Sequence, residues 1–86
     1  MKIVINRDYG GFQLKKEHIE YILNKYNIVD HDFYLDERNS PILVDAVENS
    51  NCDSSLKVVE IPDDIDWEIK EYDGMEWVAE KHRIWY

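Results

Sequence analysis

The chain has 86 residues and a formal net charge of −9, from 19 Asp and Glu against 10 Lys and Arg. A hydrophobic share of 44% is ordinary for a globular protein and excludes the class of disordered chains. The length predicts one domain over residues 1–86, and no apolar run approaches the ~20 residues that span a bilayer. With a single cysteine, Cys52, and no secretory pattern at the start, a cytoplasmic protein without internal disulfides is expected.

The negative charge is concentrated in the middle of the chain. Residues 30–68 hold twelve Asp and Glu but only two Lys and Arg. Such a field opposes binding to nucleic acid or to an anionic membrane and favours a protein partner with a basic surface, although solubility alone also explains it. The carboxylates expected to face a partner are Asp36, Glu37, Asp45, Glu48, Asp63 and Asp64.

The first predicted element is a β-strand over residues 2–9, because Ile3, Val4 and Ile5 form a β-branched run. Gly10 and Gly11 then end the strand, between two aromatic residues. Two glycines permit a sharp turn or a close backbone approach. A turn into a helix and a loop that cradles a ligand are the two interpretations that stay open.

Two helices are predicted next. The spacing of apolar residues predicts a helix over residues 15–26 with a buried stripe of Ile19, Ile22, Leu23 and Tyr26. No usual capping residue precedes Lys15, and His18 is expected to be partly exposed. Residues 30–38 suggest a short strand or an ordered loop. A second helix is predicted from Pro41, capped by Ser40, with Asp45 and Glu48 on its outer side.

The last third of the chain predicts a strand over residues 56–61 and then a hairpin over residues 66–86. Asp73 and Gly74 supply the two positive φ angles that a type I′ turn needs. This turn pairs Ile69 with Val78 and Glu71 with Glu76. We expect the face with Trp67, Ile69 and Val78 to be buried, and both carboxylates to lie in water near the turn; a cation site or a contact for a basic partner is the alternative.

These elements predict an α+β fold, in which two helices pack on one face of a small, mainly antiparallel sheet. An exposed edge strand would also permit a homodimer.

Two motifs resemble those of a known group of proteins. YGGF at residues 9–12 and EWVAEKHRxW at residues 76–85 are similar to motifs of small uncharacterised bacteriophage and prophage proteins. The resemblance implies a phage source, a compact α+β domain and a location in the host bacterial cytoplasm. It implies no activity. Lys15 and Ser40 depart from the pattern of that group at positions that affect helix capping.

The two motifs also hold a set of aromatic, cationic and glycine residues that would meet if the first strand lay beside the last. Three interpretations of this mixture stay open: a site that stacks on a flat ligand such as a nucleotide, a hot spot for protein binding, or only the core of the domain and its rim. The candidate ligand-binding residues are Arg7, Tyr9, Gly10, Gly11, Phe12, Trp77, His82, Arg83 and Trp85.

Chemistry of other kinds has little support in the sequence. Three scattered His residues and one Cys give no metal-ligand spacing, so neither a metal nor a cofactor is expected. His82 and Glu80 share one side of the predicted hairpin and form the one candidate acid–base pair.

Three functions are therefore expected, in decreasing order of support. The first is a non-enzymatic phage-encoded binding protein that inhibits a host defence factor through its acidic surface. The second is a protein that sequesters a small molecule such as a nucleotide signal. The third is a small hydrolase-like enzyme.

Overall fold

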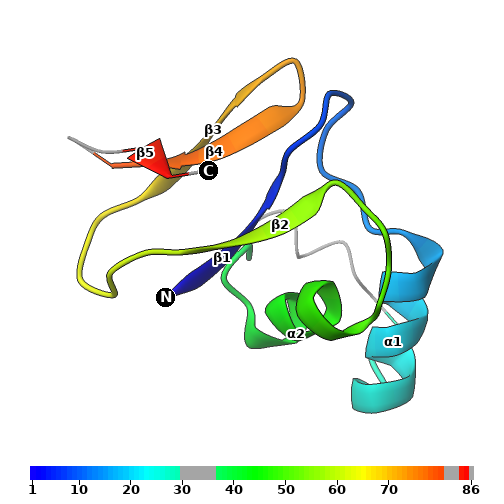
Figure 1. The fold of residues 1–86 in the computed structure, drawn as a ribbon. Helices are drawn as coiled ribbons and strands as arrows, with labels where there is room; N and C mark the ends of the chain where they lie inside the picture. Colours follow the sequence, from blue (N-terminus) through cyan, green and yellow to red (C-terminus); the bar gives the residue numbers. More distant parts are fainter. Residues whose placement is uncertain (30–36, 81–83, 86) are drawn as a thin grey trace.

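The structure is a computed structural model that describes residues 1–29, 37–80 and 84–85, the last two by their backbone. Figure 1 shows the order of its elements. These are β1 (Lys2–Asn6), α1 (Lys16–Tyr26), α2 (Pro41–Asn49), β2 (Leu56–Glu60), β3 (Glu68–Tyr72), β4 (Met75–Ala79) and β5 (Ile84–Trp85).

The strands form two antiparallel sheets. β1 pairs with β2, with Val4 opposite Val58, and β4 lies between β3 and β5 in the second sheet. The two-stranded sheet is the middle layer: the helices lie on one side of it and the β3–β4 hairpin on the other (Figure 1). α2 packs directly on β1 and β2, and α1 packs on α2.

Alternation along β1 explains how one short strand serves two cores. Val4 belongs to the apolar cluster on the helix side, with Ile22 and Leu43. Its neighbours Ile3 and Ile5 belong to the cluster on the hairpin side, and all three β1 residues are fully buried. The near-continuous apolar run at the start of the chain is therefore the pattern of a strand covered on both faces.

The predicted fold class and the Asp73-Gly74 hairpin turn are confirmed, but the prediction of only two strands over residues 66–86 is wrong: β4 ends at Ala79, and β5 is a third strand that pairs antiparallel with β4. The fold is α+β, with two helices on one face of antiparallel strands. Asp73 and Gly74 have φ of 54° and 93°, and Ile69 pairs with Val78 as predicted. The prediction did not separate the strands into two sheets. Residues 30–36, where a short strand was considered, lie outside the described residues.

The helix starts differ from expectation. His18 is fully buried rather than partly exposed, and its Nδ1 accepts the Lys15 backbone N–H at 3.1 Å, which caps α1. Ser40 does occupy the position before Pro41, but its side chain makes no capping hydrogen bond. Leu23, expected in the buried stripe of α1, is 40% exposed.

No helix among the described residues is long and apolar enough to cross a bilayer.

Candidate functional site

The Gly10-Gly11 loop lies directly against the hairpin turn, and Figure 1 shows the two side by side. The Gly10 backbone N–H donates to the Asp73 carbonyl oxygen at 3.2 Å. A Cβ atom on Gly74 would lie 2.2 Å from the Gly11 nitrogen and 2.5 Å from the Gly10 nitrogen. The glycines therefore allow two backbones at opposite ends of the sequence to touch, which favours the structural interpretation of this loop.

A buried ion pair lies beside this contact. Arg38 donates through Nη1 to Glu76 Oε1 at 2.7 Å and through Nη2 to Oε2 at 2.9 Å. The side chains of Arg38 and Glu76 are only 6% and 8% exposed. The Asn6 backbone N–H also donates to Glu76 Oε1, at 2.7 Å. A bidentate guanidinium and one backbone donor satisfy a carboxylate that burial would otherwise penalise strongly.

The expectation that Glu71 and Glu76 both lie in water is thus wrong for Glu76. Like charges do not meet across the ladder, because Glu76 turns inward to Arg38 while Glu71 is exposed. Glu71 instead accepts the Gly74 backbone N–H at 2.8 Å and closes the turn. The sequence analysis assigned no role to the Arg38 side chain, which is one of two cations in the acidic region 30–68.

Two candidate ligand-binding residues contact the buried Arg38–Glu76 pair. Arg7 donates to the Glu76 backbone oxygen at 2.7 Å. Phe12 places its ring under the Arg38 guanidinium, 3.8 Å from the ring centroid. We call this assembly the chain-end junction: Arg7, Gly10, Gly11, Phe12, Arg38, Asp73, Gly74 and Glu76. Its polar groups are directed at one another.

The remaining candidate ligand-binding residues are not all brought together. Tyr9 is 60% exposed and lines a hollow of about 520 Å³ with the two loop glycines and the hairpin turn. Trp77 lines a different hollow on the hairpin. His82, Arg83 and the Trp85 side chain lie outside the described parts of the chain, so the predicted His82–Glu80 pair does too.

Three of the candidate partner-binding carboxylates share one hollow of about 460 Å³. Asp45, Glu48 and Asp63 line it, and each pairs with a cation of the chain itself. Glu48 pairs with Lys2 at 3.1 Å, Asp45 with Lys25 at 2.8 Å, and Asp63 with the amino group of Met1. Glu37 and Asp64 are exposed outside this hollow, and Asp36 is not among the described residues.

Asp45 is the most heavily engaged of these carboxylates. Besides Lys25, it accepts hydrogen bonds from the hydroxyls of Tyr21 and Tyr26 and from Asn49. The bond from Lys25, followed by those from Tyr26 and Asn49, lowers the pKa of Asp45. In return, the pKa of Lys25 is raised, first by Asp45 and then by Tyr21. This network joins α1 to α2, so Asp45 is committed to the fold rather than offered to a partner.

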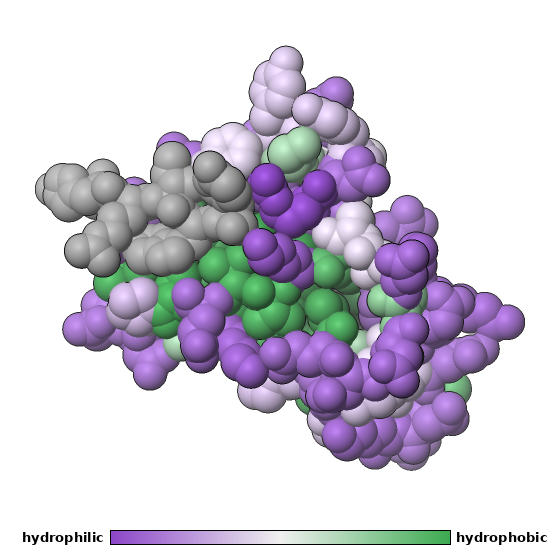
Figure 2. All heavy atoms as spheres, viewed as in Figure 1, coloured by the Kyte–Doolittle hydropathy of each residue, from purple (hydrophilic) through white to green (hydrophobic). Residues whose placement is uncertain are grey.

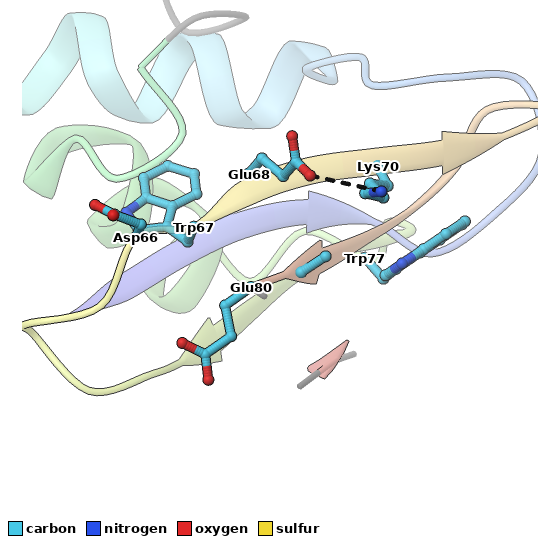
Figure 3. Close-up of a pocket in the computed structure, with 7 residues that line it drawn as sticks. Asp66, Trp67, Glu68, Lys70, Trp77 and Glu80 are labelled. Carbon is cyan, nitrogen blue, oxygen red and sulfur yellow. Dashed lines mark ion pairs between the residues drawn. The ribbon is translucent and has the colours of Figure 1, made fainter. Parts of the chain in front are cut away.

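A second acidic surface lies on the hairpin, where Figure 3 shows a hollow over β3 and β4. Its volume is about 630 Å³. We call it the tryptophan hollow; its lining residues are Asp66, Trp67, Glu68, Lys70, Trp77, Ala79 and Glu80. Among the residues that the structure describes, three carboxylates and one ammonium group therefore line it. The two indoles lie at opposite ends, and Lys70 lies between Glu68 and Trp77 (Figure 3).

Strand geometry places most of these residues. Glu68 and Lys70 are two positions apart on β3 and share a face, and Trp77 pairs with Lys70 across the ladder. The hairpin alternation predicts this face except for Trp67 and Glu80, which it places on the opposite face. Trp67 precedes β3 and reaches the hollow as well as the hairpin-side core. Lys70 pairs with Glu68 at 3.5 Å, and both side chains are more than half exposed.

The tryptophan hollow continues an acidic segment, residues 60–68, which contains no Lys or Arg. Its five carboxylates are all exposed: Glu60, Asp63, Asp64, Asp66 and Glu68. Over the whole described part of the chain, thirteen Asp and Glu are exposed against six Lys. Figure 2 shows hydrophilic residues over much of one face, with a band of apolar residues across its middle.

Catalytic groups are not evident among the described residues. Burial, followed by the hydrogen bond to Glu17, raises the pKa of the Cys52 thiol, so it is protonated at neutral pH. In the described ranges, no three His, Cys, Asp or Glu side chains lie close enough together to hold a metal ion.

Comparison of the chain with protein-family models, with curated proteins and with solved structures finds no match.

Proposed function

We propose that this chain is a non-enzymatic binding protein that attaches to a basic protein surface through its acidic segment and the adjoining tryptophan hollow. With the phage origin that the motifs imply, the partner would be a host protein, and binding would block it. A defence factor is the class of host protein that a small phage inhibitor would most usefully block.

The observation that carries this proposal is the uneven use of charge. The Glu76 carboxylate of the chain-end junction and the Asp45 carboxylate are held by groups of the chain itself. Of the five exposed carboxylates of residues 60–68, Asp66 and Glu68 line the tryptophan hollow with two indoles and one ammonium group, that of Lys70. Asp63 pairs with the amino group of Met1. A surface that recognises a basic partner typically has exposed acidic groups around aromatic side chains.

Salt dependence of capture tests the proposal. Tagged protein would be incubated with bacterial lysate at ~50 mM and ~500 mM salt, because charge pairing between exposed groups is screened over this range. We expect basic proteins to be retained at low salt and released at high salt. A retained partner that has an acidic surface, or that is held equally at both concentrations, would contradict the proposal.

A matched pair of triple variants locates the surface. Asp64→Asn, Asp66→Asn and Glu68→Gln remove three charges from the acidic segment. Glu17→Gln, Glu20→Gln and Asp53→Asn remove three exposed charges elsewhere. We expect the first set to abolish capture and the second to preserve it; the reverse result would place the interface on the helix side.

Nucleotide binding is a second candidate, favoured by one observation. A hollow of about 580 Å³ is lined by Gly10, Gly11, Lys15 and Lys16 at the start of α1, where backbone N–H groups attract anions. A bound nucleotide would raise the melting temperature by mass action. The absence of any shift with ~1 mM nucleotides, in a protein that Lys15→Gln does not unfold, would remove this candidate.

A further inference from the structure

We infer that the tryptophan hollow is a receptor for an arginine or lysine side chain presented by an extended basic segment of the partner. This inference rests on the proposed function and names the chemistry of the group recognised. It follows from the charge, the aromatic walls and the internal ammonium group of the hollow.

The charge of the hollow selects a cation. Among the described residues of the lining, Asp66 and Glu68 contribute two negative charges and Lys70 one positive charge, so the balance is negative without counting Glu80. An entering guanidinium or ammonium group gains favourable electrostatic energy there, whereas a phosphate or carboxylate is repelled. Charge complementarity therefore commits the hollow to a basic occupant.

The two indoles add a contact that a simple acidic patch lacks. Trp67 and Trp77 are each half-buried, so their positions are held by the fold while part of each ring remains accessible. The face of an indole attracts a cation, and arginine also stacks on it through its planar group. A volume of about 630 Å³ lies within the range of sites that hold small organic groups and admits a long side chain.

Lys70 shows that this surface already accommodates an ammonium group. Its Nζ lies 3.5 Å from Glu68 Oε1, and Lys70 is the residue that pairs with Trp77 across the ladder. Because both partners of this ion pair are more than half exposed, the pair is weak and an incoming cation can replace it. Lys70 is thus an internal competitor for the same carboxylate.

The hollow is also built on a supported surface. The opposite side of the hairpin packs through Val78, which is fully buried, onto Ile3 and Ile5 of β1. The chain-end junction fixes the hairpin turn. A receptor held from behind in this way loses little conformational entropy on binding.

The test is a binding titration with a labelled peptide of alternating arginine and glycine, measured by fluorescence anisotropy. The same peptide with citrulline in place of arginine is the ligand control, because citrulline keeps the shape and removes the charge. We expect the arginine peptide to bind, its affinity to fall steeply with salt, and the citrulline peptide to bind at least ten-fold more weakly.

Two lysine variants make the decisive comparison. Lys70→Gln removes the internal competitor and should tighten binding about three- to five-fold. Lys57→Gln changes the net charge of the protein equally, but Lys57 is an exposed residue of β2 that does not line the hollow, so affinity should change less than about two-fold. A gain in affinity cannot arise from unfolding. Trp77→Ala should weaken binding about five- to ten-fold.

The outcomes separate the two proposals. If the arginine peptide binds with salt dependence but Lys70→Gln and Lys57→Gln change affinity equally, the hollow is not the receptor, and the acidic-surface function stands. If the arginine peptide does not bind any of these proteins at low salt, both the receptor and the proposed function are contradicted.

Discussion

The chain-end junction and the tryptophan hollow contain the same kinds of residue in opposite states. Both combine carboxylates, cations and aromatic rings. In the junction, Arg38 and Glu76 are buried against each other, and Phe12 covers the guanidinium. In the hollow, Glu68 and Lys70 form a loose, exposed pair beside Trp77. Burial and internal pairing, rather than composition, therefore distinguish the structural cluster from the surface that we propose for recognition.

The largest effect is expected from breaking the junction. Arg38→Met leaves the Glu76 carboxylate buried without its cation and should lower the free energy of unfolding by about 3–5 kcal/mol. Chemical denaturation followed by circular dichroism measures this. Arg38→Met combined with Glu76→Leu removes both charges and should recover part of the loss. If the single variant unfolds like the parent protein, the pair does not hold the junction.

The contact between the two glycine turns gives the next largest effect. Gly74→Ala places a methyl group 2.2 Å from the Gly11 nitrogen at a φ of 93° and should cost about 3 kcal/mol. Gly11→Ala has the same φ of 93° but meets no atom within 4 Å, so it should cost about 1–2 kcal/mol. Equal losses in the two variants would show that backbone conformation, not close approach, explains Gly74.

A smaller effect is expected from His18, a buried polar residue that belongs to neither region. Burial, opposed in part by Glu17, lowers the pKa of its imidazole below 6.5. The imidazole is therefore neutral in the folded protein: Nδ1 accepts the Lys15 N–H, and the proton is on Nε2. Stability is full above pH 6.5 and decreases as the pH falls through the folded pKa, because only the unfolded chain takes up the proton readily.

The matched variant for this effect is His18→Gln, since a Gln at this position also accepts the capping N–H but does not titrate. We expect the denaturation midpoint of the parent protein to fall between pH 7.5 and pH 5 by more than that of the variant. Parallel curves for the two proteins would contradict the assignment.

The smallest effect on stability is expected where the effect on binding is largest. Glu68→Gln removes one side of a loose, exposed ion pair and should leave the unfolding free energy within about 0.5 kcal/mol of the parent value. It should weaken binding of the arginine peptide several-fold. Asp45→Asn should do the opposite. It should lower the denaturation midpoint, because Asp45 joins α1 to α2, and it should leave peptide affinity unchanged. Loss of binding in Asp45→Asn alone would reverse the two roles.

Local chemistry was sufficient to predict several of the elements, although not the end of β4 at Ala79 or the third strand β5. The Asp73-Gly74 turn, the apolar run of β1 and the Pro41 start of α2 depend on neighbouring residues, and the structure has each of them. The burial of Glu76 was not predictable, because its partner Arg38 is 38 positions away and the strand pattern alone places Glu76 opposite Glu71. Gly10 and Gly11 indicated a close approach, but the sequence did not reveal that Gly74 is what they approach.

The candidate partner-binding carboxylates also show that the sequence does not reveal contacts between distant residues. Asp45, Glu48 and Asp63 were selected for their charge, yet each pairs with a cation that only the fold brings near. The tryptophan hollow was not among the predicted sites as a unit, although hairpin alternation already placed Lys70 and Trp77 on one face. Its walls come from residues on both sides of the turn, so the signal was the register rather than any motif.

The most direct measurement is an NMR titration of ¹⁵N-labelled protein with the arginine peptide, following the indole N–H signals of Trp67 and Trp77 and the backbone amides of Gly74 and Glu76. We predict that the two indole signals shift in proportion to bound peptide while the amides of the chain-end junction stay in place. Shifts confined to the junction amides, with both indoles unchanged, would contradict the division of the molecule into a closed structural cluster and an open recognition surface.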